Sequence, residues 1–153
     1  MPRSNPLPEL GGDRGSAAVE FLTMGVLLLV PIVYLVLTLA ALQGAAFAAE
    51  GVARQAARLI ATGDTEAAGR SAADAAVRVG LADWRVSARA AAVTVTCSPR
   101  PDDCLTPRGT VRVTVRVAVA LPLMPPALAV NAPGVVPVEA HALQPVSMFR
   151  VAP

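Results

Sequence analysis

The sequence predicts an α+β protein with a long N-terminal transmembrane helix, a short second helix and a small antiparallel sheet of two to three strands. Three features of the chain lead to this fold class. Residues 21–49 carry no charged side chain, residues 65–79 carry alanine at helical spacing, and the last third of the chain alternates apolar with polar residues. At 153 residues, the chain has room for one modest domain beside the membrane segment.

The charge-free segment is long enough to cross a lipid bilayer. As an α-helix, residues 21–49 would extend about 43 Å, whereas about 20 apolar residues span the hydrocarbon core. The chain is 54% apolar with a mean hydropathy of +0.56, and this excess is concentrated in the segment. We therefore expect residues 16–61 to form a transmembrane helix and its extension, and residues 62–153 to form an α+β domain.

Beyond the membrane, the first helix becomes amphipathic and a second helix follows. The apolar face of the extension is predicted to hold Val52, Ala56, Leu59 and Ile60. Thr62-Gly63-Asp64 predicts a break, with an N-cap at Asp64 or Thr65, and Gly80 predicts the C-cap of the second helix. The apolar side of the second helix is predicted to hold Ala68, Ala72, Ala75, Ala76 and Val79.

The last third of the chain has the period of two that is typical of β-strands. Residues 110–121 place five valines on one face, and residues 92–97 alternate in the same way. Residues 135–142 are a possible third strand. We expect an antiparallel sheet whose valine face is covered by the alanine-rich helix, with Leu81 and Trp84 covering the open end of the core.

Cys97 and Cys104 flank a turn-rich segment between the first two predicted strands. Two cysteines in a chain with an N-terminal apolar segment favour one disulfide formed in an oxidising compartment, although two unpaired thiols are an alternative. A bridge would join the end of the first strand to the following loop. With a single histidine and no Cys-x-x-Cys, the chain has too few soft ligands for a zinc site.

The junction before the apolar segment reads RGSAAVEF, from Arg14 to Phe21. Glu20 is the last charged residue before the segment. A glutamate near a helix N-terminus is stabilised by the macrodipole by about 0.3–1 kcal/mol, which is the simplest explanation for Glu20. If the chain were cut after Gly15, however, Ser16 would become the first residue and Glu20 the fifth.

This arrangement resembles the class III signal of type IV pilins and pseudopilins, and in detail the TadE family of the tight-adherence (Flp pilus) system. Members of that family begin with a Gly-x-x-AVEF-like junction. The matching residues here are Gly15, Ala18, Val19, Glu20 and Phe21. The resemblance covers about residues 14–58; the rest of the chain is similar only in type, as a short strand-containing extracytoplasmic domain. Ser16 replaces the Phe that is usual at this position in type IV pilins, but Tad-type pilins relax it.

The resemblance implies that a prepilin peptidase cuts between Gly15 and Ser16 on the cytoplasmic side, so that residues 1–15 are a leader peptide. The processed protein would be a minor pilin or pseudopilin, single-pass in the cell membrane, that associates with other Tad pilins and pilus-assembly proteins. An unpaired carboxylate entering hydrocarbon is costly. The α-amino group of a neighbouring subunit could neutralise Glu20, which would then set the axial register between subunits.

Two other readings of the N-terminal region remain open. Ala46-Phe47-Ala48 has the A-x-A form of a signal peptidase site, and cleavage there would release a secreted binding module of unknown ligand. An uncleaved chain would be a plain anchor for such a module. Arginines both precede and follow the apolar segment, so the positive-inside rule does not choose an orientation. A cytoplasmic N-terminus and an extracytoplasmic domain follow only from the cysteine pair and the pilin-like junction.

The composition argues against several other classes of function. A net charge of +2 and an aromatic content of 3% give little basis for binding nucleic acid. All thirteen basic residues are arginine, which excludes lysine-based mechanisms. Glu139 and His141 lack a nucleophile nearby in the sequence, and Asp102-Asp103 is typical of a solvated turn. We expect no enzymatic activity, no cofactor, no metal and no small-molecule substrate.

Overall fold

The computed structural model describes residues 16–84, 86, 91–123 and 134–150. The chain divides into two compact units, Met1–Val36 and Leu37–Pro153, which are described separately. Gly15 and the predicted leader lie outside the described residues.

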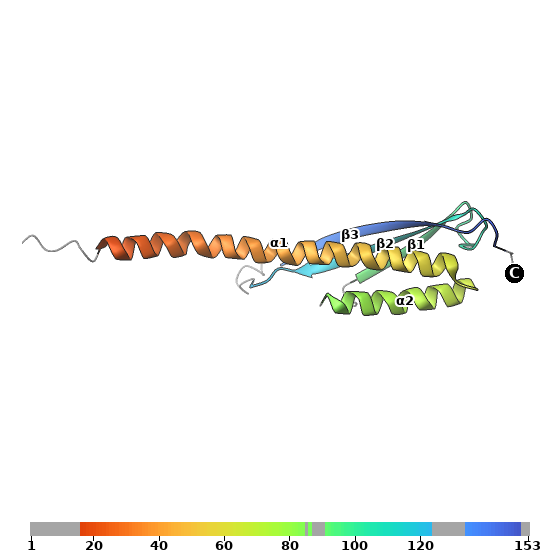
Figure 1. The fold of residues 1–153 in the computed structure, drawn as a ribbon, viewed down its shortest axis with the longest axis horizontal. Coiled ribbons are helices and arrows are strands. Elements are labelled where there is room, and N and C mark those ends of the chain that lie inside the picture. Colours follow the sequence, from red (N-terminus) through yellow and green to blue (C-terminus); the bar gives the residue numbers. More distant parts are fainter. Residues whose placement is uncertain (1–15, 85, 87–90, 124–133, 151–153) are drawn as a thin grey trace, which may run out of the picture. The chain divides into compact units, whose positions relative to one another are not determined.

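Two helices and three strands follow one another along the chain, in the order that the sequence predicts (Figure 1). They are α1 (Ser16–Thr62), α2 (Glu66–Asp83), β1 (Ala91–Ser98), β2 (Thr110–Ala120) and β3 (Val135–Pro145). The predicted α+β class is therefore confirmed, with three strands in the sheet.

In the first unit, the described chain is a single stretch of α1. The helix runs through Pro31 without a break, and most of its large apolar side chains are exposed. Phe21, for example, is 78% exposed and Leu27 is 70% exposed. Among the described residues, α1 is the one helix long and apolar enough to cross a membrane.

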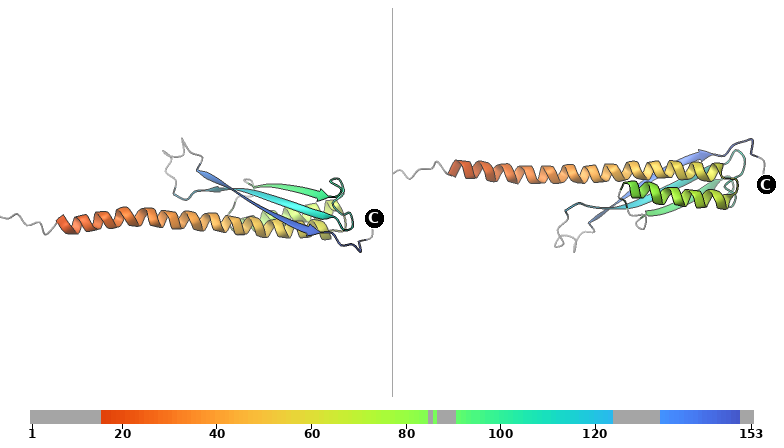
Figure 2. Two further views of the ribbon diagram at one scale, coloured as in Figure 1. Left: turned by 90° about the horizontal axis from the view of Figure 1, so that it is seen from above. Right: turned by 60° about the horizontal axis from the view of Figure 1, so that its bottom comes forward.

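The second unit is a three-stranded antiparallel sheet with two helices on one face (Figure 2). The strands lie in the order β1-β2-β3; β2 pairs with β3 along its whole length and with β1 from Thr110 to Val117. The predicted valine face of β2 is the centre of the core, since Val111, Val113 and Val115 are fully buried. The residues between them point away from the helices, and Arg112 and Arg116 are exposed there.

The C-terminal half of α1 packs into this core through small residues. Its buried residues are Ala45, Ala48, Ala49, Val52, Ala53, Ala56, Ala57, Ile60 and Ala61. The predicted face of Val52, Ala56 and Ile60 is thus confirmed, with Leu59 partly buried beside it. Since alanine has no side chain beyond Cβ, the helix backbone can lie close to its neighbours.

The start of α2 is as predicted, but its buried face is not. Thr65 is the N-cap, and its hydroxyl accepts a hydrogen bond from the Ala68 amide at 3.2 Å. The buried residues of α2 are Gly69, Ala73, Val77 and Leu81, in place of the predicted Ala68, Ala72, Ala75, Ala76 and Val79. Val79 is 64% exposed. The predicted C-cap at Gly80 is also wrong, because α2 continues to Asp83 and is capped by Trp84.

Close approach between α1 and α2 explains this difference. A Cβ added to Gly69 would lie 3.0 Å from Cα of Ile60, and one added to Gly80 would lie 2.5 Å from Cγ1 of Val52. The glycines are therefore contact points between the helices. The face that contains them also carries Val77 and Leu81, the largest apolar side chains that α2 buries.

Candidate functional site

The N-terminal part of α1 carries the residues that the sequence singles out. Ser16 is the first residue of α1 that the structure describes, and Glu20 and Phe21 are exposed on the helix. Glu20 lies beyond the first turn, which holds no acidic residue. Stabilisation of a carboxylate by the helix macrodipole declines within the first turn. The macrodipole therefore contributes little to the stability of Glu20 at this position.

Glu20 is followed by a long stretch of helix without charge. The next charged side chain along α1 is Glu50, which pairs with Arg54 at 3.2 Å one turn further on. Between them, Thr23 satisfies its hydroxyl inside the helix by donating to the Val19 carbonyl at 2.7 Å. This stretch therefore offers apolar side chains to its surroundings.

A cleft of about 610 Å³ opens at one end of the sheet in the second unit. Its walls are α1 around Gly44, the residues that follow α2, the end of β2 and the start of β3. An added Cβ on Gly44 would lie 3.6 Å from the Trp84 ring, so the indole packs over this glycine. All the residues that line the cleft are apolar, and Trp84 itself is 54% exposed.

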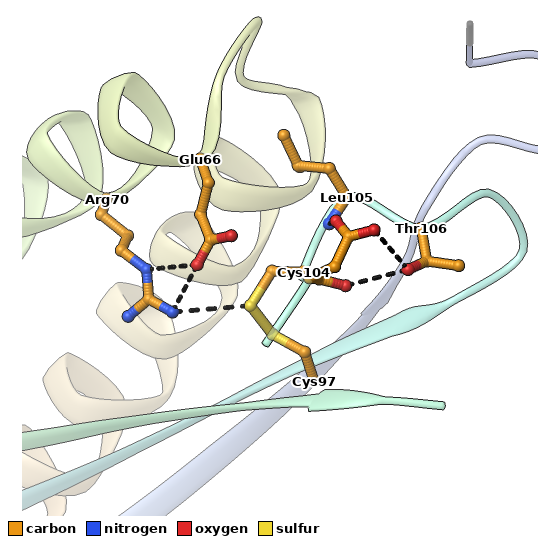
Figure 3. Close-up of a disulfide and its surroundings, with 7 residues drawn as sticks. Glu66, Arg70, Cys97, Cys104, Leu105 and Thr106 are labelled. Carbon is orange, nitrogen blue, oxygen red and sulfur yellow. Dashed lines mark hydrogen bonds and ion pairs between the residues drawn. A yellow bond between two sulfur atoms is a disulfide. The ribbon is translucent and has the colours of Figure 1, made fainter. Parts of the chain in front are cut away.

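The opposite end of the sheet is closed by the disulfide (Figure 3). Cys97 lies at the end of β1 and Cys104 in the loop before β2; they are bonded to each other, with Cα atoms 5.0 Å apart. In the same loop, the Asp103 carboxylate accepts from the Leu105 amide at 3.1 Å and from the Thr106 hydroxyl at 2.9 Å. The loop is thus held by its own covalent and polar contacts.

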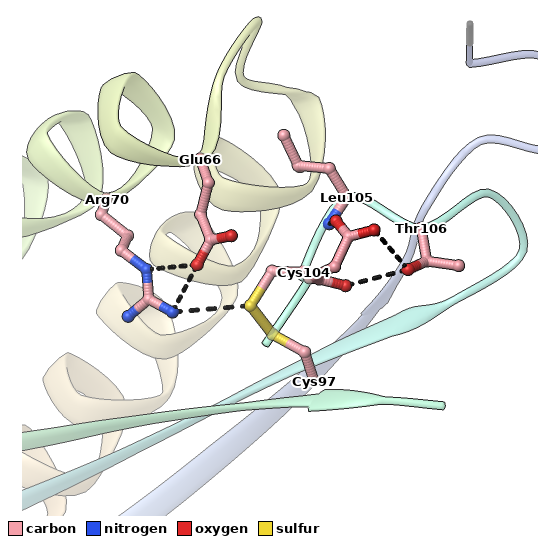
Figure 4. A network of polar contacts seen from close by, with 7 residues as sticks. Glu66, Arg70, Cys97, Cys104, Leu105 and Thr106 are labelled. Atoms are coloured by element: carbon pink, nitrogen blue, oxygen red, sulfur yellow. Dashed lines mark hydrogen bonds and ion pairs between the residues drawn. A yellow bond between two sulfur atoms is a disulfide. The ribbon is translucent and has the colours of Figure 1, made fainter. Parts of the chain in front are cut away.

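An arginine of α2 joins the disulfide to the helical layer (Figure 4). Nη2 of Arg70 lies 3.6 Å from Sγ of Cys104 and donates to Glu66 at 2.7 Å. Arg70 and Glu66 are one turn apart on α2, so the pair orients the guanidinium toward the loop. These contacts are typical of a structural site, because the cysteines are bonded and no reactive thiol is present.

The outer face of the sheet carries the polar residues considered for catalysis. Glu139 accepts a hydrogen bond from Nε of Arg116 at 2.6 Å, and this bond, with the charge of the carboxylate, raises the pKa of Arg116. His141 is exposed and lies opposite Thr114 of β2. Glu139 is therefore engaged in an ion pair on an open surface.

Within the described part of the chain, no group of three or more metal-binding side chains comes together. Asp103 of the predicted Asp102-Asp103 turn accepts hydrogen bonds within its loop and lies 3.9 Å from Arg100.

The apolar cleft was not predicted from the sequence, because its walls come from four separate segments. The one local signal for the cleft was Trp84, which was expected to cover the end of the core.

No protein-family model, curated protein or solved structure matches this chain.

Proposed function

We propose that the protein is a TadE-like minor pilin or pseudopilin, a structural component of a Tad (Flp) pilus or of a related secretion apparatus. It is anchored in the cell membrane by α1 after a prepilin peptidase has removed residues 1–15. One observation carries the proposal: α1 places one carboxylate at Glu20 and then continues without a charged side chain as far as Ala49, with most of its large apolar side chains exposed from Phe21 to Leu39.

The exposure of this stretch supports the membrane anchor. Leu22, Leu28 and Leu35 are each more than half exposed in the single chain. Covering one such side chain contributes about 1.5–3 kcal/mol. Many residues of this kind on all sides of one helix are unfavourable in water, so a bilayer, together with neighbouring subunits, surrounds the helix.

The position of Glu20 supports a role in subunit assembly. The carboxylate stands at the boundary of the apolar stretch and lies past the first turn of α1. A charged group entering hydrocarbon is stable only if it is paired or hydrated. The α-amino group that cleavage creates on Ser16 of a neighbouring subunit supplies this partner, and the pair fixes the axial offset between two copies.

The disulfide supports placing the second unit outside the cytoplasm. Structural disulfides form and persist in oxidising compartments and are rare in the bacterial cytosol. With Cys97 and Cys104 bonded, the N-terminus is then cytoplasmic and the sheet extracytoplasmic. A secreted module cut after Ala48 is less favourable, since Ala48 and Ala49 are buried inside the continuous α1. Cleavage there would remove part of the packed core.

The mature N-terminus tests the proposed processing. The full chain is produced in bacterial membranes with and without a Tad-type prepilin peptidase, and its first residue is determined by mass spectrometry. We expect Ser16 only when the peptidase is present. Gly15→Leu should abolish this cleavage, whereas Gly12→Leu, a glycine replacement within the same leader, should leave it intact. An N-terminus at Met1 in every case indicates a plain anchor, and one at Ala49 a secreted module.

Replacement of Glu20 tests the proposed assembly role separately. Glu20→Gln removes the charge and keeps the size of the side chain, so the processed protein should still enter the membrane. Its crosslinking to other pilins and its support of pilus formation should be lost. Glu50→Gln is the matched control, because Glu50 is the next carboxylate on α1 and is exposed beside Arg54. If both variants assemble as the native chain does, the register role is wrong.

A further inference from the structure

The apolar cleft lies where α1 would leave the bilayer. Phe21–Val36, the part of the charge-free segment in the first unit, rises only about 24 Å as a helix. The hydrocarbon core is about 30 Å thick and takes about 20 residues. The span therefore continues for several residues into the second unit, up to about Ala40. Ala40 and Ala41 are the first residues of α1 that line the cleft.

The same end of the second unit exposes large apolar side chains. Phe47 is 63% exposed, Trp84 54% and Leu123 76%. They come from α1, the end of α2 and the segment after β2, so no single helix face accounts for them. Asp83, the neighbour of Trp84 in the sequence, is also exposed. An exposed carboxylate is compatible with a position at the level of the lipid headgroups, where water is present.

The opposite end of the sheet has a different chemistry. Arg100, Asp102 and Arg108 are exposed in the loop between β1 and β2. Arg150 lies past the end of β3 and binds backbone carbonyls at the end of α1. The second unit therefore has one apolar end that is continuous with the charge-free part of α1, and one charged end.

We propose that the apolar end of the second unit rests in the membrane interface and that the cleft beside Trp84 holds an acyl chain of a phospholipid. Tryptophan favours this layer because its ring is largely apolar while its N–H needs a polar partner. Lipid is the occupant favoured over a second copy of the chain, because the cleft begins at the depth where the span ends. The inference depends on the membrane anchor of the proposed function and is independent of the pilus.

Trp84 is the one tryptophan of the chain, so it reports on its own surroundings. The full chain is reconstituted at low density in vesicles of phosphatidylethanolamine and phosphatidylglycerol. Part of the lipid is replaced by phosphatidylcholine brominated on its acyl chains, which quenches tryptophan on contact. We expect Trp84 to lose most of its emission, and more with bromine near the glycerol than with bromine at the chain end.

A second chain moves the reporter to the charged end of the sheet. Phe149 is 80% exposed and follows the last residue of β3. The first residue of β3, Val135, lines the cleft at the other end of the strand. The eleven residues of β3 extend about 34 Å, whereas interfacial elements enter only about 5–10 Å into the bilayer. In the double variant Trp84→Phe/Phe149→Trp, brominated lipid should therefore leave the emission unchanged.

A charge placed on the cleft wall tests the occupant directly. Val119→Asp puts a carboxylate on the inward face of β2, where Val119 lines the cleft, and should reduce the quenching of Trp84 several-fold. Thr114→Asp is the control, because it adds the same charge to β2 but five residues from Val119, about 17 Å away. This control should leave the quenching of Trp84 as it is in the native chain.

The outcomes separate the two proposals. If the chain does not float with the vesicles, the membrane anchor is wrong and the lipid contact with it. If it floats but Trp84 is not quenched, the lipid contact alone is overturned. A blue-shifted emission without quenching would mean that a second copy covers the cleft, and this too overturns the lipid contact while leaving the anchor in place.

Discussion

The two halves of α1 are built from different apolar residues, although they belong to one helix. Residues 16–36 carry Leu, Val, Ile, Met and Phe on all sides, and these are exposed. Residues 45–61 bury nine residues, seven of them alanine, against α2 and the sheet. The first half thus exposes large apolar side chains, whereas the second half buries small ones, so that its backbone lies close to α2 and the sheet.

The difference shows that the size of apolar residues carries information that hydropathy does not. A helix surrounded by lipid gains from large side chains in every direction, since no shaped partner limits them. A helix packed on a sheet and a second helix must fit a fixed space at high density. Alanine at Ala49 and Ala53, both 0% exposed, is what that space allows.

The largest test of this contrast applies one substitution to both halves. Ile60 is 1% exposed in the core, whereas Ile32 is 48% exposed in the first half of α1. Ile60→Ala should lower the free energy of unfolding by about 2–5 kcal/mol, because it leaves a cavity. Ile32→Ala should leave it unchanged. The measurement is urea unfolding of the full chain in detergent micelles, followed by Trp84 emission.

Equal effects of the two isoleucine variants would contradict the comparison. An unfolding midpoint lowered by Ile32→Ala would mean that the first half of α1 contributes to the folded unit. An unchanged midpoint for Ile60→Ala would mean that α1 does not hold the sheet through its second half.

The disulfide provides the next largest effect, and it too acts on the packed half of the molecule. Removing the bridge by Cys97→Ala and Cys104→Ala together should cost about 2 kcal/mol, since a short loop would no longer be closed in the unfolded chain. The native chain treated with reductant should lose the same amount. If only the reduced chain is destabilised, the cost comes from burying two thiols and not from losing the covalent link.

The sequence was sufficient for the elements whose signal is local. The alternating valines of β2 define both the strand and its buried face, and Thr65 marks the start of α2 through its hydroxyl. It was insufficient for the face of α2, because alanines lie on several sides of that helix. The choice is made by Gly69 and Gly80, and their contacts with α1 are tertiary. The cleft was missed for the same reason, whereas Gly15 and Glu20 are proposals from the sequence pattern alone.

A third test uses glycine to measure how closely the two helices approach. Gly69→Ala should cost about 1–3 kcal/mol, because the added Cβ would meet the backbone of Ile60 at 3.0 Å. Gly51→Ala is the matched control: Gly51 is also helical, and nothing lies within 4 Å of an added Cβ. It should stabilise the chain by up to about 1 kcal/mol through helix propensity. Similar changes for both glycines would show that α2 can move away from α1 at little cost.

The smallest test concerns the polar contact that closes the packed half. Nη2 of Arg150 donates to the Asp64 carbonyl at 3.0 Å and also to the Gly63 carbonyl, at the turn between α1 and α2. Carbonyls at a helix C-terminus lack intrahelical partners and attract cations. Arg150→Ala should therefore lower the free energy of unfolding by about 1 kcal/mol. Arg150→Lys should retain part of this, because it keeps the charge but not the planar pair of donors.

Arg54→Ala is the reference for this last prediction, because Arg54 is exposed on α1 and forms an ion pair with Glu50 one turn away. An exposed pair of this kind contributes little to stability. The Arg150 variant should thus unfold at a lower urea concentration than the Arg54 variant. If the two midpoints coincide, the contacts of Arg150 do not hold the turn, and the packed half of α1 is stabilised by its apolar contacts alone.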